Sequence, residues 1–207
     1  MTALARATPK RRRGDTRQRL LESALSVFAR HGFDRATIDE IVRDAGFSKG
    51  AFYVHFESKE DLFWALLEER IARQQEAFRQ AVDPRSPVVE NVRTILGGVF
   101  ALYRTDPLWT AMFMEFGAHA LRNEKVRQRL ADMYKRWHGL IVEILRASRE
   151  GGRVRQDIDV EFIASAVIAV VEGTLMQSRL APDVVRLDEM VEPLARTLAD
   201  WLEPKAS

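Results

Sequence analysis

The chain has no cysteine among its 207 residues, which excludes a disulfide framework and a thiolate metal site. It also lacks a long apolar run, because the longest, residues 163–171, is far shorter than the roughly 20 residues needed to span a bilayer. No apolar run follows the N-terminal basic residues, as a signal peptide would require. From these absences we expect a soluble, cytoplasmic protein with no membrane partner.

Signatures of catalysis are missing as well. The sequence shows no glycine-rich phosphate loop, no activated nucleophile and no paired-carboxylate site, so we expect neither an enzyme nor a cofactor. One metalloenzyme alternative stays open. Glu115 and His119 lie four residues apart on one helical face, and His138 is a conceivable third ligand. We favour surface or pocket hydrogen bonds for these side chains and predict no metal.

What the chain does contain is a balanced, core-forming composition with basic charge at one end. Hydrophobic residues make up 46%, charged residues 30%, and the formal net charge is +2. Residues 1–13 hold no acid and carry five cations, Arg6, Lys10, Arg11, Arg12 and Arg13. This basic arm is either a solvated tail or a tail that follows DNA phosphates or enters a minor groove.

Apolar spacing beyond the arm is helical throughout, with no strand-like alternation, so the predicted fold class is all-α. Asp15 with Gln18, and Thr37 with Glu40, form candidate capping boxes. Ser48 and Ser58 are further candidate caps, and Gly46 ends the helix that Thr37 starts. We expect helices from Asp15 to Gly32, over 38–45, from Ser48 to near His55, and over 59–81, 87–104, 107–121, 124–150, 159–180 and 187–202.

A break rich in proline and polar residues at 83–87 ends the long helix over 59–81, but it is short and lacks glycine and serine bias, so it is not a flexible linker between independent domains. We expect a basic arm over 1–13, a three-helix domain over 14–74 that contains the stretch 37–56, and a larger helical domain over 75–207. A long helix joins the two domains.

The stretch 37–56 carries the main functional signal. Two short helices separated by a tight turn form a helix-turn-helix, whose second helix enters the major groove. The residues expected inside are Ile41, Val42, Ala45, Phe47, Phe52 and Phe56. The residues expected to contact DNA are Thr37, Ser48, Lys49, Gly50, Ala51, Tyr53, His55 and Lys59.

Each outer group has a plausible contact. Lys49 can donate to guanine or phosphate, Ala51 can touch a thymine methyl, and Gly50 lets the backbone approach closely. Hydroxyl and imidazole groups can hydrogen-bond phosphates, and Lys59 begins the next helix within possible reach of one. An ordinary helical hairpin explains each residue singly, but the set beside a basic arm favours DNA binding.

The sequence resembles a known family at these positions. Residues 16–17, 21–28, 31–33, 37–41, 45–56 and 58–62 are similar to the DNA-binding domain of TetR/AcrR-type transcriptional regulators, over about 14–74. The run Gly50–Phe56 is close to a family signature. The resemblance implies that Thr37, Ser48, Lys49, Gly50, Tyr53, His55 and Lys59 take the DNA-contacting positions. Residues 114–120, 151–157 and 172–173 resemble, more loosely, the effector and dimerisation bodies of many members.

The second domain offers a candidate pocket and a candidate interface. Large adaptable side chains are either core packing or the lining of an apolar effector cavity, namely Phe100, Tyr103, Trp109, Met112, Phe113, Phe116, Trp137, Ile141 and Met176. The helix over 159–180 is apolar nearly all round and needs burial on more than one side. With the last helix it predicts a two-fold interface built from Phe162, Ala166, Val170, Gly173, Leu194, Leu198 and Trp201.

Within that apolar helix Glu172 is an isolated acid, for which we expect Arg179 or another cation, or a place at the pocket or interface. The predicted function is a homodimeric, ligand-responsive repressor that binds a pseudo-palindromic double-stranded DNA operator and is released by a small, largely apolar effector. Two alternatives remain: a TetR-like activator, and a helical small-molecule-binding protein without operator binding.

Overall fold

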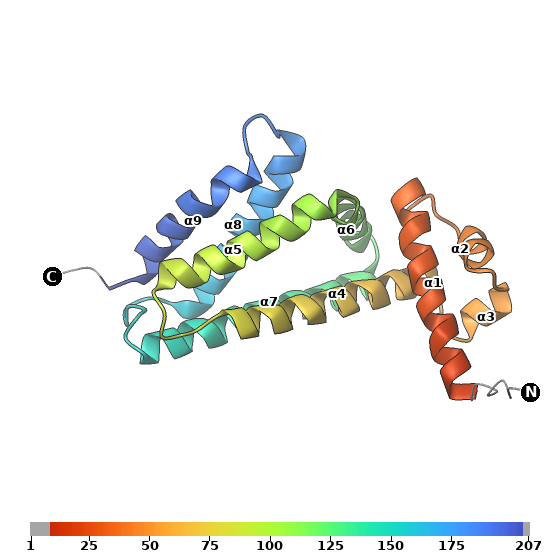
Figure 1. Cartoon of the computed structure of the whole chain (residues 1–207), viewed down its shortest axis with the longest axis horizontal. Helices are drawn as coiled ribbons and strands as arrows, with labels where there is room; N and C mark the ends of the chain where they lie inside the picture. The colour runs from red at the N-terminus through yellow and green to blue at the C-terminus, as the bar shows by residue number, and fades with distance from the viewer. Residues whose placement is uncertain (1–8, 205–207) are drawn as a thin grey trace, which may run out of the picture. The chain divides into compact units, whose positions relative to one another are not determined.

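The chain folds into helices connected by short loops (Figure 1). The structure is a computed structural model that describes residues 9–204, and the side chains of 14–106 and 109–204 within them. This described part contains nine helices and no strand, which confirms the all-α prediction. They are α1 (Pro9–His31), α2 (Ile38–Ala45), α3 (Lys49–Tyr53), α4 (Lys59–Ala81), α5 (Val88–Thr105), α6 (Pro107–Ala120), α7 (Glu124–Glu150), α8 (Val160–Leu180) and α9 (Leu187–Leu202).

Two predicted boundaries differ from the observed ones at the N-terminal end. The first helix begins at Pro9, so Asp15 lies inside it and does not cap it. Lysine and arginine are good helix formers, and a single interior glycine costs only about 1 kcal/mol, so the basic residues before Gly14 continue the helix. Residues 1–8 of the predicted basic arm lie outside the described residues. The third helix ends at Tyr53, slightly before the expected end.

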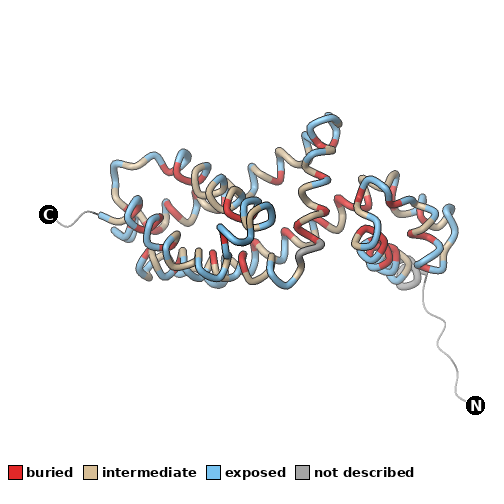
Figure 2. The backbone as a smooth tube through the Cα atoms, turned by 90° about the horizontal axis from the view of Figure 1, so that it is seen from above, coloured by how far each residue is buried: buried red, intermediate tan, exposed pale blue. Residues whose placement is uncertain are grey.

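Contacts between helices divide the chain into two units. The head unit comprises the described residues up to Ala72 together with Leu108–Val126, and therefore includes α6. The body unit comprises Arg73–Pro107 and the described residues from Arg127 onward. Figure 2 shows that buried positions alternate with exposed ones along the helices of both units, as amphipathic periodicity requires.

The head unit has an aromatic core. Phe33, in the loop between α1 and α2, packs edge-on against Phe63 at 5.2 Å and against Phe116 of α6 at 5.3 Å between ring centroids. Phe28 and Trp109 also contact the Phe63 ring. Edge-to-face pairs contribute about 0.5–1.5 kcal/mol beyond burial, so this cluster holds α1, α4 and α6 around the loop that leads into the helix-turn-helix.

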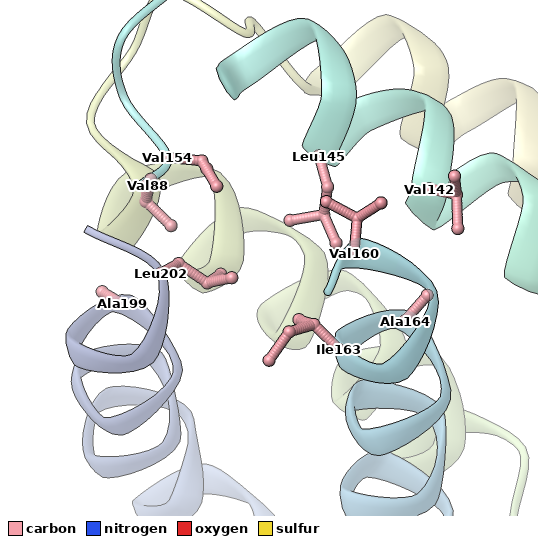
Figure 3. Packing of buried hydrophobic residues seen from close by; sticks show 9 residues of the cluster. All are labelled: Val88, Val142, Leu145, Val154, Val160, Ile163, Ala164, Ala199 and Leu202. Carbon is pink, nitrogen blue, oxygen red and sulfur yellow. The ribbon is translucent and has the colours of Figure 1, made fainter. Parts of the chain in front are cut away.

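The body unit is built around α5, which lies against α9 and also contacts α8 (Figure 1). Figure 3 shows the buried cluster at one end, where Val88 of α5 and Leu202 of α9 lie near Val154 of the α7–α8 loop, and Leu145 of α7 lies near Val160 of α8. A second cluster contains Leu96, Phe100, Leu175, Ala195 and Leu198. Fully burying one such large side chain contributes about 1.5–3 kcal/mol.

α8 is apolar well beyond the run over 163–171 considered above. The helix has 21 residues, and an 18-residue window within it has a mean hydropathy of 1.5, with 22% of that window buried. By length and composition alone it is long and apolar enough to cross a membrane. Single helices in soluble proteins pass the same test, so this is weak evidence for a membrane span.

Candidate nucleic-acid interface

The first helix of the motif is fixed at both ends. At its start the Thr37 hydroxyl oxygen accepts a hydrogen bond from the Glu40 N–H at 3.3 Å, and the Glu40 carboxylate accepts from the Thr37 N–H at 2.9 Å. These bonds confirm the predicted capping box. The Thr37 hydroxyl, 2.8 Å from the Glu40 carboxylate, and then the Thr37 N–H lower the pKa of Glu40. At its end Gly46 has φ +73°, a left-handed conformation that glycine adopts without strain.

Polar contacts lock α2 onto α1. The Ser23 hydroxyl lies 2.9 Å from the Ile41 carbonyl and 2.8 Å from the Asp44 carboxylate, and Arg30 lies 2.7 Å from the same carboxylate. The Ser23 hydroxyl, and then Arg30, lower the pKa of Asp44. Arg19 donates to the Ala45 carbonyl at 2.9 Å. These contacts orient α2 before any DNA arrives.

α3 is a single short helix whose two sides differ sharply. The Ser48 hydroxyl oxygen accepts from the Ala51 N–H at 3.3 Å and confirms the predicted cap. Phe52 is fully buried and contacts Phe56, whereas Tyr53 is 58% exposed. Of the six residues predicted to lie inside, five are buried; Phe47 stays half-exposed beneath the Arg19 guanidinium, which is 4.9 Å from its ring centroid.

Most of the predicted DNA-contacting residues share the outer surface of α2 and α3. Thr37, Ser48, Lys49, Gly50 and Tyr53 are exposed, and Ala51 and His55 are half-exposed. Gly50 leaves room for a methyl group, since an added Cβ would meet only the Ser48 hydroxyl oxygen, at 3.6 Å. The protein itself therefore does not require glycine there, which is compatible with close approach of DNA.

Lys59 is placed differently from the phosphate contact that the sequence predicted. Its ammonium donates to the carbonyls of Phe33 at 2.7 Å, Asp34 at 3.0 Å and Ala36 at 3.0 Å. An ammonium has three hydrogens, and these bonds use all of them. Burial lowers the pKa of Lys59. Lys59 therefore closes the α1–α2 loop, a role that only the folded loop reveals.

Glu115 and His119 of α6 contact the same region of the head unit. Glu115 accepts from the Phe33 N–H at 2.7 Å, and an added Cβ on Gly32, whose φ is +75°, would lie 3.0 Å from both Glu115 oxygens. His119 packs edge-on against Phe33 and lies 3.8 Å from Glu60. In the body unit, His138 contacts Glu161 at 2.9 Å. Among residues with described side chains, no group of three histidine or acidic residues could hold a metal ion.

The candidate pocket residues are found in both units. Trp109, Met112, Phe113 and Phe116 belong to the head unit, where Trp109 and Phe116 pack on Phe63. The body unit holds Phe100 and Tyr103 in one core cluster, Ile141 in another, and Trp137 against Phe78. Met176 is 53% exposed, which argues against a place in the core.

Glu172 has a partner that the sequence did not single out. The Tyr134 hydroxyl of α7 donates to its carboxylate at 2.6 Å, whereas Arg179 lies nearly two helical turns away. Burial raises the pKa of Glu172, and burial followed by the carboxylate raises the pKa of Tyr134. A carboxylate on an apolar helix requires a hydrogen-bond donor. A hydroxyl group meets that requirement as well as a cation does, so the sequence could have indicated either kind of partner.

The candidate interface residues divide between surface and core. Phe162 is 68% exposed and Trp201 is 42% exposed, whereas Leu198 is buried at 2% within the body unit and is unavailable to a partner. Ala166, Val170, Gly173 and Leu194 are half-exposed. Further exposed apolar side chains lie on α8 and in the loop after it, namely Met176, Leu180 and Val184.

Comparison with known proteins identifies the family. Residues 20–66 match bacterial regulatory proteins of the tetR family, and residues 88–203 match the C-terminal part of BetI-type transcriptional repressors. The transcriptional repressor AcnR of Corynebacterium diphtheriae is 27% identical over 176 residues, 85% of this chain and 87% of AcnR. Salmonella enterica GusR has the same fold, with a TM-score of 0.74 at 26% identity over 90% of this chain and 96% of GusR.

A third comparison concerns the fold alone. FadR from Bacillus subtilis, solved in complex with stearoyl-CoA, has a TM-score of 0.75 at 18% identity, over 89% of this chain and 98% of FadR. The family matches cover both the helix-turn-helix and the helical part behind it. With a buried inner face and an exposed polar outer face on α2 and α3, the chain belongs to the TetR family of DNA-binding transcriptional regulators, of the repressor type.

Proposed function

We propose that the chain is a ligand-responsive repressor that binds a pseudo-palindromic operator as a homodimer and is released by a small, largely apolar effector. One observation carries the DNA-binding part. The outer surface of α2 and α3 gathers hydroxyl, ammonium and phenol groups, while the inner surface is buried and locked to α1. In the cytoplasm such a surface meets duplex DNA, with α3 in the major groove.

The proposed contacts follow from exposure and chemistry. Lys49 donates to a base edge, and Tyr53 and His55 donate to phosphates. Thr37 and Ser48 use their hydroxyl oxygens as caps. The Thr37 hydroxyl donates its hydrogen to the Glu40 carboxylate at 2.8 Å, and the Ser48 hydroxyl offers its hydrogen to a phosphate. Ala51 and Gly50 present small surfaces that allow close approach.

The homodimer is supported by the apolar stripe on α8. Phe162, Ala169 and Met176 recur every seven residues on the exposed side, and Leu180 continues the stripe at 72% exposure. Contiguous exposed apolar side chains of this kind mark protein interfaces in soluble proteins. A two-fold partner would cover the stripe together with Trp201, and it would present two α3 helices to one operator.

The effector is proposed to bind the body unit, beside the aromatic side chains of Phe100, Tyr103 and Trp137. The Tyr134–Glu172 pair supplies a polar group in an otherwise apolar region. Long-chain acyl thioesters are reasonable first compounds to test because the FadR fold holds stearoyl-CoA. Release requires that the effector bind the DNA-free shape more tightly, and a coupling of about 1–3 kcal/mol changes operator affinity roughly 5–150-fold.

The test starts with an operator selected from random duplex DNA by the wild-type protein. Lys49→Ala and Tyr53→Phe should each weaken operator affinity by about tenfold, the loss of one good contact. Lys125→Ala is the matched control, because Lys125 is also an exposed head lysine, 75% exposed at its ion pair with Glu57. Equal affinity of all four proteins would remove the assignment of α3 as the reading helix.

The dimer and the effector need separate measurements. Phe162→Glu with Met176→Glu should yield a monomer in sedimentation analysis and abolish tight operator binding, while the exposed positions leave the fold intact. Compounds from an apolar library should lower operator affinity and raise the thermal stability of the free protein. A monomeric wild-type protein, or a compound that binds without changing operator affinity, would contradict the corresponding part.

A further inference from the structure

A charged pair on the proposed DNA surface is not explained by the contacts above. The Lys49 ammonium lies 2.8 Å from the Asp39 carboxylate, and the two side chains are 56% and 66% exposed. Asp39 comes from the first turn of α2 and Lys49 begins α3, so the pair bridges the two helices of the motif. The hydrogen bond and the charge of Asp39 raise the pKa of Lys49.

The pair changes what Lys49 can gain from DNA. A lysine that neutralises a phosphate releases a counterion, but a lysine already balanced by a carboxylate brings no net charge to that contact. Moving Lys49 onto a phosphate would also leave the Asp39 carboxylate unpaired beside a polyanion. Base edges carry no formal charge. Lys49 can therefore donate one hydrogen to a guanine while another stays on Asp39.

We propose that Asp39 is a specificity-determining residue, which keeps Lys49 on base edges and withholds it from phosphates. The inference rests on the proposed DNA contact of α3 and adds a residue that opposes binding to non-cognate DNA. Asp39 lowers affinity for every sequence, but it lowers affinity least where a guanine edge accepts from the paired ammonium. Specificity is the difference in binding free energy between the operator and non-cognate DNA, so it rises when Asp39 weakens non-cognate binding more than operator binding.

The experiment uses the full chain, a non-cognate random duplex and the selected operator, over a series of salt concentrations. Asp39→Asn keeps the shape and removes the charge. It should steepen the slope of log affinity against log salt on the random duplex by about 0.9, the value for one added phosphate contact, and raise that affinity roughly eightfold near 0.1 M salt. The operator should gain less, so the ratio of operator to random-duplex affinity falls.

Further variants distinguish an effect of the Lys49–Asp39 pair from the general effect of removing one negative charge. Glu22→Gln makes the same charge change at an exposed α1 residue whose hydrogen bond is to Gln18 on its own helix. Lys49→Ala should leave the random-duplex slope of the wild-type protein unchanged, yet abolish the added slope in the Asp39→Asn background. Asp39→Ser should repeat the Asp39→Asn result, and amide exchange of α2 checks that each variant is folded.

The outcomes are distinguishable. An added slope that depends on Lys49 and is absent from Glu22→Gln supports the inference. If Asp39→Asn and Glu22→Gln coincide, or if the added slope survives Lys49→Ala, Asp39 has no such role, although the repressor proposal stands. A wild-type protein that binds no duplex at any salt concentration overturns both.

Discussion

Replacing Lys59 with methionine should destabilise the head unit without weakening phosphate contacts. The ammonium donates to three loop carbonyls at 2.7–3.0 Å and lies 4.6 Å from the centroid of the Phe33 ring. Methionine fills the same stem volume and removes the three donors. The α1–α2 loop, which positions Thr37 and hence α2, then loses its closing contact.

The magnitude follows from the type and burial of these bonds. A hydrogen bond from a charged donor contributes about 1.5–3 kcal/mol, but the carbonyl of exposed Asp34 regains water when the donor is removed. The ammonium also carries a desolvation cost, shown by its lowered pKa. We expect a net loss of about 2 kcal/mol, which is roughly a 30-fold faster exchange of the α2 amide hydrogens.

Lys125→Met provides the comparison, since Lys125 lies 3.4 Å from Glu57 with both side chains mostly exposed. Such a pair contributes about 0–1 kcal/mol, and exchange of the α2 amides should barely change. If Lys59→Met left exchange equally unchanged, the loop-closing role would be wrong. A salt slope on random DNA about 0.9 shallower than that of Lys125→Met would restore Lys59 as a phosphate contact.

Three further substitutions separate fold from function. Gly50→Ala should keep or raise thermal stability, because alanine favours helix by about 0.5–1 kcal/mol, yet weaken operator affinity in a binding titration. Gly32→Ala should cost at least about 1–2 kcal/mol in denaturant unfolding, from its φ of +75°. Glu115→Ala removes the steric contact but also the acceptor of the Phe33 N–H, so the steric part is the difference between the cost of Gly32→Ala in the wild type and its cost in the Glu115→Ala background. Arg93 and Arg196 donate to Glu192 and lower its pKa from 4.5 to about 2. Because the folded-state pKa is depressed, the stabilisation is present above pH 4.5 and is lost as the pH falls toward 2. Glu192→Gln should therefore reduce the pH dependence of the denaturation midpoint between pH 4.5 and 2.

Helix identity and ends were predictable where they depend on local chemistry. The Thr37–Glu40 box, the Ser48 cap and the Ser58 cap each join groups within three residues, so sequence spacing alone determines whether they meet. The start of α1 was predicted wrongly because a suitable capping residue does not by itself end the helix before it. Asp15 is a good cap, but the preceding basic residues are good helix formers, and no breaker separates them from it.

Partners across the fold were not predictable in this way. Periodicity shows that Trp109 and Phe116 are apolar positions of one helix, but it does not show that their neighbour is Phe63. Periodicity also does not show with which helices α6 packs. Its contacts group it with the head unit, where Glu115 also accepts from the Phe33 N–H, and the effector pocket stays a prediction.

The number of cations available to DNA was the property least predictable from the sequence, because composition counts ionic groups without showing which of them are already paired. Lys49 faces Asp39, Arg30 faces Asp44, Arg17 faces Glu69, and Lys59 is surrounded by carbonyls, all inside the head unit. A paired cation adds little to counterion release. The salt dependence of DNA binding should therefore be weaker than the number of head cations implies. Sequence discrimination should depend more on groups that can reach a base edge while they keep their ion-pair partner, and Lys49 is the proposed example.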